Sequence, residues 1–387
     1  MMTAASITTQ MSNVDNVQTN LPPAMPPPGR PRRTRTILWG LIGSLVAVVA
    51  AVLIAASIIT VPYVIIAPGQ TYVANELVSV SGDNTSYPAI GEIRFVTVSE
   101  RVDPTLLDKL QADYNGDDQV LPRDEILGNQ TREQNDLANQ AAMATSKDTA
   151  ALVALRKLGY DVPADVLITQ IVPDTPAAAI AKEGEVIAAI DGVVVSSTGA
   201  LRSALGARAP GDVVTVELVD AQGVHRTAQV ALADNPDNPG HAFLGVGLGD
   251  RPKLPFQVNI DTSQVGGPSA GLAFTLAILE VLTPGELTGG QVVAATGTID
   301  ADGHVGAIGG IQQKVVTVQH EGVKVFLVPA DDNCGNGGSC NYTEAKAKAG
   351  DRLQIIPVAT LDEALQALSS LGGNALALGE PGKAPTS

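Results

Sequence analysis

The sequence predicts a mixed α/β (α+β) domain, preceded by a smaller β-rich domain and by one N-terminal transmembrane helix. Strand-like and helix-like segments alternate over 253–371, which is typical of an α/β layer fold. Short β-branched runs, separated by turns rich in Gly, Pro and Asp, occupy 150–235. Twenty-three consecutive uncharged residues fill 37–59, enough for a helix to cross a hydrocarbon core of about 30 Å.

The first 60 residues predict a membrane anchor. Residues 1–36 are polar and proline-rich, so we expect a disordered arm. The alternative is a cleaved signal peptide, but both this arm and the apolar segment are longer than such a peptide needs, which favours an uncleaved helix over 37–60. Four arginines and one aspartate give the arm a net charge of +3. This charge predicts a cytoplasmic N-terminus, a single pass through the cell membrane and an extracytoplasmic chain beyond residue 60.

Composition limits the partners and cofactors. The chain has a formal net charge of −16 and only 3% aromatic residues, which argues against nucleic acid as a partner. The four histidines have no ligand spacing, so the sequence predicts no metal and no other cofactor. Residues 61–149 are interpreted as an extracytoplasmic connecting region, with a strand over 92–98 and a polar, helix-rich stretch over 101–144. Residues 372–387 are predicted to be a loose tail.

The β-rich region carries recognisable motifs. The segments PDTPAAA, GEVIAAIDG, ALRSALGA and PGDVVTVEL predict strands over 166–172, 186–190 and 213–219 and a helix over 201–207. Residues 150–235 thereby resemble a PDZ domain of the bacterial type, and the resemblance implies binding of extended peptides by strand addition. Gly184-Glu185 replaces the usual Gly-Asp, and the carboxylate-binding loop expected near 159–162 is not recognisable. A β-rich spacer is the alternative.

The C-terminal region contains a candidate nucleophile. We expect strands over 256–260, 291–296, 323–328 and 353–358, a hairpin turn at 300–303, and helices over 268–282, 311–320, 343–349 and 361–371. The segment VGGPSAG precedes a helix that is apolar on nearly every face. Pro268 suits the first helical position, so Ser269 is predicted in the first turn, where free N–H groups can bind an oxyanion. Gly267 and Ala270 are its supporting neighbours; a serine that only caps the helix is the alternative.

Lys314 is the candidate base for this serine. It lies on a segment that otherwise presents Val315, Val316 and Val318, so we expect it to be buried. Loss of solvent would lower the lysine pKa from about 10.4 toward neutrality. A neutral amine could then accept the serine proton, as in Ser-Lys hydrolases. The alternative is an ordinary solvated lysine.

Together these motifs resemble the proteolytic domain of the Lon peptidase family. The resemblance rests on GGPSAG, TGTIDADGHVGAIGGIQQK, VFLVPADDN, NYTEA and IIPVATLDEAL, and it covers 253–371. It implies a serine endopeptidase in which Ser269 attacks, Lys314 acts as base and Thr296 orients the lysine. Gly266 stands where many members have Asp, which removes an expected carboxylate. With an anchor and a PDZ domain in front, the order resembles membrane-anchored, PDZ-containing Lon-like proteases.

The resemblance also bears on partners. It implies protein or peptide substrates that are exported or near the membrane, and the anchor implies contact with a lipid bilayer. No G-x-x-x-x-G-K-[ST] segment occurs, so the chain carries no P-loop ATPase motif. Lon-type domains often form rings, so a homo-oligomer stays open.

Two rival functions and one candidate disulfide follow from other residues of the sequence. Residues 267–271 also fit G-x-S-x-G, the nucleophile elbow of α/β-hydrolases, with Asp300 and His320 downstream, although that elbow needs a strand leading directly into the serine. The non-enzymatic rival is a PDZ scaffold with an inactive protease-like domain. Cys334 and Cys340 are the two cysteines, and outside the cytoplasm we expect a local disulfide between them; a metal site is the weaker interpretation, because partner ligands are missing nearby.

Overall fold

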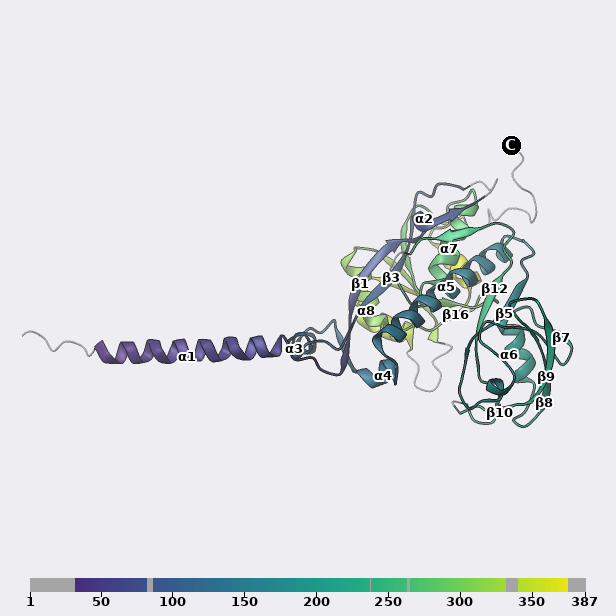
Figure 1. The fold of residues 1–387 in the computed structure, drawn as a ribbon. Coiled ribbons are helices and arrows are strands. Elements are labelled where there is room, and N and C mark those ends of the chain that lie inside the picture. Colours follow the sequence, from purple (N-terminus) through teal and green to yellow (C-terminus); the bar gives the residue numbers. More distant parts are fainter. Residues whose placement is uncertain (1–31, 82–85, 237, 263–264, 332–339, 375–387) are drawn as a thin grey trace, which may run out of the picture. The chain divides into compact units, whose positions relative to one another are not determined.

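The structure is a computed structural model that describes residues 32–81, 86–236, 238–262, 265–331 and 340–374 (Figure 1). The chain divides into two compact units, Met1–Ala55 and Ala56–Ser387, and each is described by itself. The first unit contains nearly all of helix α1 (Arg32–Ala56). Its segment Leu38–Ala56 has a mean hydropathy of 2.5 and is, within the described ranges, the one helix long and apolar enough to cross a membrane. The predicted apolar N-terminal helix is thus present.

A six-stranded mixed sheet forms the centre of the second unit. The strand order is β18-β17-β14-β3-β1-β4. Strands β18, β17, β14 and β3 run parallel to one another, whereas β1 is antiparallel to both β3 and β4. The strands are β1 (Tyr63–Val73), β3 (Glu92–Val102), β4 (Gln119–Pro122), β14 (Val292–Ala295), β17 (Val325–Pro329) and β18 (Gln354–Val358).

Helices cover both faces of this sheet. Val293 and Ala295 of β14 pack with α5, α7 and α10 in one buried cluster, while Ala294 between them packs with α8 and α9 in another. This alternation follows from the two-residue period of a strand, and it leaves β14 buried on both faces. The helices of this layered domain are α2 (Ala74–Leu77), α3 (Leu106–Tyr114), α4 (Arg123–Leu127), α5 (Arg132–Lys157), α7 (Gly271–Leu282), α8 (Ile311–His320), α9 (Asn341–Ala349) and α10 (Leu361–Ser370). The predicted α/β fold class is confirmed.

The predicted connecting region 61–149 contributes to this domain. Its strands β1, β3 and β4 supply half of the sheet, and β3 pairs directly with β14, Glu92 lying opposite Val292. Its long helix α5 packs against α7. The sequence pattern indicated a strand within 92–98, but a pattern of strand-forming residues does not specify a partner so distant in the chain. The layered domain is therefore built from two segments separated by the β-rich region.

The β-rich region forms a second sheet with the strand order β12-β5-β6-β8-β9 and β7 beside β6. Strands β6 and β8 coincide with the predicted ranges, and the helix α6 begins three residues before the predicted start. Strand β12 extends the sheet beyond the predicted limit of residue 235. The elements are β5 (Ala164–Ile171), β6 (Val186–Ile190), β7 (Val193–Val194), α6 (Thr198–Gly206), β8 (Val213–Val219), β9 (His225–Ala231) and β12 (Val246–Pro252), with short 3-10 helices at Pro176–Ala179 and Gly350–Arg352 elsewhere in the unit.

Three two-stranded sheets complete the fold. The predicted strand over 256–260 is shortened to β13 and pairs with β2, so it does not join the main sheet. The predicted hairpin turn at 300–303 connects β15 with β16. These small sheets comprise β2 (Val78–Val80) with β13 (Val258–Ile260), β10 (Ala233–Asp234) with β11 (Ala242–Phe243), and β15 (Thr298–Ile299) with β16 (Val305–Gly306).

Candidate active site

Ser269 lies in the turn that leads into α7. The helix begins at Gly271 with Ala270 as its cap, so the predicted helix start at Pro268 is two to three residues too early. The carbonyl of Ser269 explains the difference, because it accepts the N–H of Gly297 at 2.9 Å instead of a bond from within α7. The first such helical bond runs from Phe274 N–H to the carbonyl of Ala270. The serine is therefore held by the segment after β14.

Lys314 lies one turn into α8 with its side chain inside the domain. Only 2% of the residue is exposed, and its helical neighbours Val315 and Val318 pack against the central sheet. Burial lowers the pKa of the Lys314 amine to about 7, because loss of water penalises the charged form. The prediction that Lys314 is buried is confirmed.

The two side chains meet directly. The Lys314 Nζ donates to Ser269 Oγ at 2.7 Å and to Thr296 Oγ1 at 3.0 Å. The Thr296 hydroxyl in turn donates to the Ser269 carbonyl at 3.0 Å, and Thr296 is fully buried. Thr296 thus touches both the amine and the backbone of the serine, which fixes the direction from which the lysine approaches. A neutral amine at this distance is within reach of the serine proton.

Gly267 and Ala270 have different parts in this turn. The N–H of Gly267 is already bonded to the carbonyl of Asn139 at 2.8 Å, so it is not available to an oxyanion. Gly267 instead supplies a φ of +88°, a conformation that side chains disfavour. The N–H of Ala270 has no acceptor among the residues that the structure describes. Of the two supporting residues, Ala270 is the one with a free donor.

Helix α5 holds the outer side of the turn formed by residues 267–270, which carries the candidate nucleophile Ser269 and is called the nucleophile turn below. Besides the bond from Gly267 to Asn139, the Ser146 hydroxyl donates to the carbonyl of Pro268 at 3.1 Å. A Cβ on Gly271 would come within 2.9 Å of the Ile299 nitrogen and 3.2 Å of the Ser146 hydroxyl, so α5, α7 and β15 meet too closely for any side chain there. Sequence reasoning missed Asn139, which lies in the polar stretch 101–144, and Ser146, which lies just beyond it, because neither belongs to a chemical motif. A Gly at 271 facing a long small-residue helix was the available clue.

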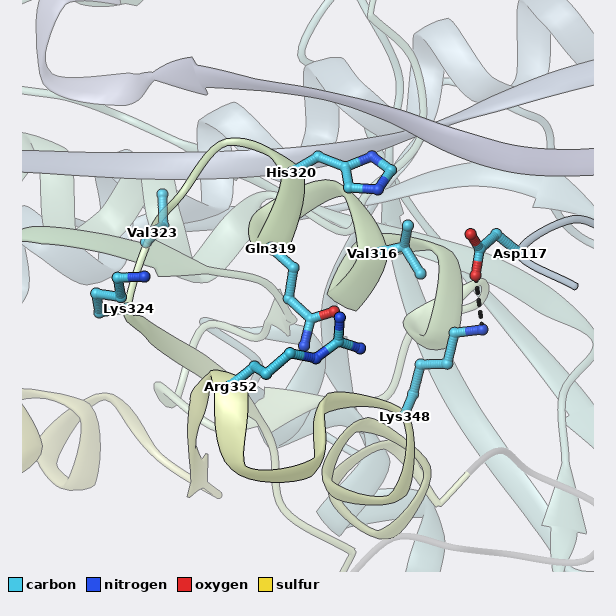
Figure 2. Close-up of a pocket in the computed structure, with 8 residues that line it drawn as sticks. All are labelled: Asp117, Val316, Gln319, His320, Val323, Lys324, Lys348 and Arg352. Carbon is cyan, nitrogen blue, oxygen red and sulfur yellow. Dashed lines mark hydrogen bonds and ion pairs between the residues drawn. The ribbon is translucent and has the colours of Figure 1, made fainter.

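His320, the base of the rival hydrolase mechanism, lies in a different part of the domain. It lines a pocket of about 600 Å³ at the end of α8, together with Asp117 and Lys348, which form an ion pair at 2.9 Å (Figure 2). Ser269 is not among the residues that line this pocket. The hydroxyl of Ser269 has Lys314 as its basic partner. The geometry therefore favours the lysine over His320 as the base.

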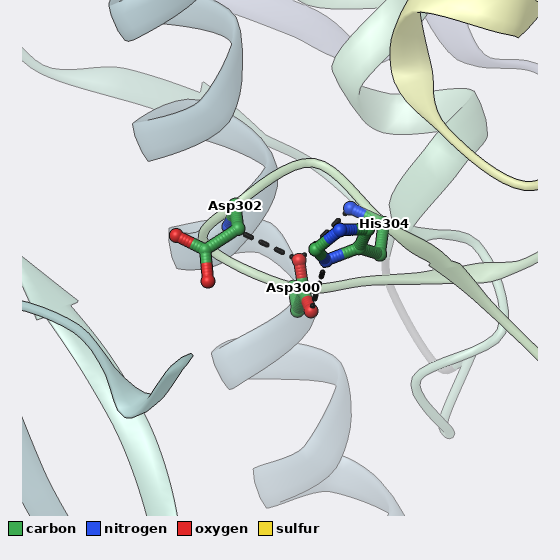
Figure 3. A group of neighbouring side chains, drawn as sticks. All are labelled: Asp300, Asp302 and His304. Carbon is green, nitrogen blue, oxygen red and sulfur yellow. Dashed lines mark hydrogen bonds and ion pairs between the residues drawn. The ribbon is translucent and has the colours of Figure 1, made fainter. Parts of the chain in front are cut away.

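Asp300, Asp302 and His304 gather at the β15–β16 turn, with candidate ligand atoms within 4.8 Å of one another (Figure 3). Asp300 accepts the backbone N–H groups of Asp302 at 3.0 Å and His304 at 2.9 Å, and its other oxygen contacts the His304 ring at 3.0 Å. These bonds account for the cluster as the closure of a tight hairpin turn.

The predicted disulfide between Cys334 and Cys340 stays a prediction, because Cys334 lies outside the described residues.

Residues 262–370 match the family profile of the Lon protease (S16) C-terminal proteolytic domain. The chain carries a Lon-type proteolytic domain. A Lon protease of Chloroflexus aggregans is 30% identical over 127 residues, which cover 30% of this chain and 14% of that protein. One from Fusobacterium nucleatum is 42% identical over 66 residues, or 17% of this chain and 8% of that protein. The chain thus spans only a small part of these relatives' length. The family profile, over residues 262–370, includes Ser269 and Lys314.

Solved structures similar to the chain include PDZ domains. That of an SdrC-like protein from Listeria monocytogenes is 22% identical, covers 22% of this chain and 86% of its own, and has a TM-score of 0.20. A solution structure from Geobacillus thermodenitrificans is 29% identical, covers 21% of this chain and 94% of its own, and has the same TM-score of 0.20. The PDZ interpretation of the β-rich region rests on its sequence motifs.

Proposed function

We propose that this chain is a membrane-anchored serine endopeptidase that hydrolyses peptide bonds of exported or membrane-proximal proteins with a Ser-Lys dyad. One observation carries the proposal: the amine of Lys314, buried and with its pKa lowered to about 7, lies 2.7 Å from Ser269 Oγ. The Lon-type domain supports the same reaction class. Among the described residues, Lys314 bonds to two hydroxyl groups and to no carboxylate. A buried lysine in that state is unfavourable for stability, which is typical of a group kept for chemistry.

In the first half of the reaction, Ser269 Oγ attacks the carbonyl carbon of the scissile bond while the neutral amine of Lys314 takes the hydroxyl proton. The carbonyl oxygen becomes an oxyanion, which the free N–H of Ala270 is placed to stabilise. The tetrahedral intermediate then collapses, and the Lys314 ammonium donates its proton to the leaving amine. The products of this half are a shortened peptide, a serine ester and a neutral lysine again.

In the second half, water replaces the departed amine. Lys314 accepts a proton from the water as its oxygen attacks the ester carbon, and the same N–H group holds the second oxyanion. Collapse expels Ser269 Oγ, which recovers the proton from Lys314. Thr296 keeps the amine directed at Ser269 through both halves, since its hydroxyl bonds to both residues.

The remaining regions serve delivery in this proposal. The α1 helix anchors the chain in the cell membrane with the N-terminus in the cytoplasm, so the dyad acts outside the cytoplasm. The β-rich region acts as a PDZ domain and recruits flexible protein segments by strand addition. Because the sequence contains no P-loop motif, cleavage of a flexible substrate needs no nucleotide hydrolysed by this chain.

The test uses the full chain in a lipid nanodisc and a fluorescently labelled, intrinsically flexible protein such as casein. We expect the wild type to release small peptides without nucleotide and the Ser269→Ala variant to release none above background. Ser370→Ala is the matched control, because within the described part of the chain that hydroxyl bonds only to its own helix, at the carbonyl of Gln366. Equal activity in Ser269→Ala and the wild type would overturn the assignment of the nucleophile, and inactivity of a folded wild type would favour the scaffold.

A further inference from the structure

A continuous trough runs past the nucleophile turn between the Lon-type domain and the β-rich sheet. Two adjoining pockets, of about 470 and 410 Å³, share residues from α5, β12, β15 and the turn before α7, and therefore form one depression. One of the shared residues is Pro268, which immediately precedes Ser269. We call this depression the α5 trough; its shared lining is Thr145, Thr149, Leu248, Pro268, Thr298 and Ile299.

The two ends of the α5 trough differ in charge. Among the residues that the structure describes, those lining the first pocket are all uncharged, and they include the small side chains of Ala138, Ala141 and Ala142 on α5. The second pocket carries Arg202, Asp250, Asp300 and His304 in its lining. The Asp250 carboxylate already has hydrogen-bond partners within the protein, because it accepts the N–H and the hydroxyl of Thr198 at 2.7 and 2.8 Å. An occupant would thus meet an uncharged wall at one end and exposed Arg202 at the other.

The wall of the trough and the nucleophile turn are joined by hydrogen bonds. Ser146 on α5 bonds to Pro268, and the Asn139 carbonyl bonds to Gly267. On the opposite wall, a Cβ on Gly249 of β12 would meet the Thr145 methyl group of α5 at 3.3 Å, so β12 lies directly against this helix. A chain seated in the trough would therefore be held in fixed register with Ser269.

The opposite side of α5 offers a contrast. A larger groove of about 890 Å³ runs there and also reaches the turn, at Val265 and Gly266. Its walls carry four charged residues of α5: Arg132, Asp136, Lys147 and Asp148. The α5 trough instead touches Pro268 on one side of Ser269 and Thr298 just after Thr296, so it flanks both the nucleophile and the residue that bonds to the lysine.

We propose that the α5 trough receives an extended, unfolded segment of the substrate beside the scissile bond and selects small, uncharged side chains. This inference rests on the proposed function. A Lys or Glu side chain against the uncharged wall would lose hydration without gaining a partner, whereas Ala or Val would bury apolar surface there. A folded protein could not enter a depression of this size, so the trough confines cleavage to flexible segments.

The experiment compares two alanines of one helix. Ala141 lines the trough, and Ala144, which is also exposed, lines the groove on the other side of α5. In the full chain, Ala141→Trp should lower kcat/KM for a quenched fluorescent peptide by about tenfold or more, mainly through KM, while Ala144→Trp stays near wild type. Ala138→Trp is the second blocking variant, in case the first melts at a lower temperature.

A second arm measures selection and separates the two proposals. Wild type should cut peptides with Ala or Val at successive positions beside the scissile bond at least about tenfold faster than those with Lys or Glu at one of these positions. Equal losses for Ala141→Trp and Ala144→Trp, a loss only for Ala144→Trp, or a preference for charged peptides would overturn the trough. Cleavage abolished by Ser269→Ala would show in each case that the proposed peptidase stands although the trough fails.

Discussion

A buried titratable group lies beside each end of helix α7, Lys314 of α8 at one end and Glu280 of α7 itself at the other, and their surroundings differ. At the N-terminal end, burial lowers the pKa of Lys314 to about 7 beside the Ser269 hydroxyl. At the C-terminal end, burial is also the largest cause that raises the pKa of Glu280, again to about 7. Glu280 is 1% exposed, accepts the N–H of Leu287 at 2.7 Å and neighbours the carboxylate of Glu286. Glu286 in turn accepts backbone N–H groups of Ile90 and Gly91.

The comparison shows that a displaced pKa does not by itself identify chemistry. Loss of water brings the pKa of both groups to about 7, because it lowers the pKa of Lys314 and raises that of Glu280. The lysine faces the candidate nucleophile Ser269 and the hydroxyl of Thr296, whereas Glu280 joins α7 to Leu287 in the loop that follows the helix. Geometry separates a candidate base from a structural carboxyl group. The predictions that follow test this separation.

The largest effect is expected from Lys314→Arg. Arginine keeps its proton at every accessible pH, so it cannot accept the proton of Ser269. Peptidase activity should fall by at least about 1000-fold, as in Ser269→Ala, and the double variant should be no worse than either single one. Glu280→Gln provides the comparison and should retain wild-type kcat. Appreciable cleavage by Lys314→Arg would return His320 to consideration.

The pH dependence of activity should follow the lysine. Because the free base is required, kcat/KM should rise through a midpoint near pH 7 and fall about tenfold for each unit below it. The profile is measured with an uncharged peptide between pH 5 and 9. In Glu280→Gln the midpoint should stay where it is, and a displaced midpoint in that variant would mean that the two ends of α7 are coupled.

Thr296 should contribute less than the dyad. Thr296→Val keeps the shape but removes both hydroxyl bonds, to Lys314 Nζ and to the Ser269 carbonyl. We expect kcat to fall by about 10- to 100-fold with KM little changed, and the pH midpoint to shift as the amine loses a partner. Thr296→Ser restores the hydroxyl and should recover most of the rate. If both variants behave alike, the role of Thr296 lies in packing.

The smallest effect concerns stability at the other end of α7. The pKa of Glu280 is raised in the folded state, so its contribution to stability is complete below about pH 4.5 and is lost as pH rises through about 7. Glu280→Gln resembles the protonated acid and should be more stable than wild type at pH 8, by about 1–3 kcal/mol, and equal to it at pH 4.5. Urea unfolding of the full chain at both pH values checks this.

The stability contribution of Lys314 changes with pH in the opposite direction. Because its pKa is lowered in the folded state, the free energy of unfolding increases with pH between about 7 and 10.5.

Sequence reasoning reached the chemistry of the site better than its support. The glycine-rich turn at Ser269 and the lysine among valines are local patterns, and burial of Lys314 follows from the apolar residues around it. The start of α7 was misplaced because a contact distant in the chain, Gly297 N–H to the Ser269 carbonyl, competes with the helical bond. Asn139 and Ser146 act through a backbone carbonyl and a hydroxyl on a polar helix, which no motif distinguishes. Pairing of β3 with β14 likewise depends on contacts that local patterns do not encode.

The composite sheet has a consequence for how the protein is made. Strand β3 leaves the ribosome early, but its neighbour β14 follows only after α5, the whole β-rich region and α7. Ser269 emerges before Thr296 and Lys314, and β17 and β18, which extend the sheet beyond β14, come later still. Assembly across such sequence separations is slow. On the proposed function, a nascent chain therefore has no working dyad while most of it is being synthesised, and the capacity to cut proteins is among the last properties that the growing polypeptide acquires.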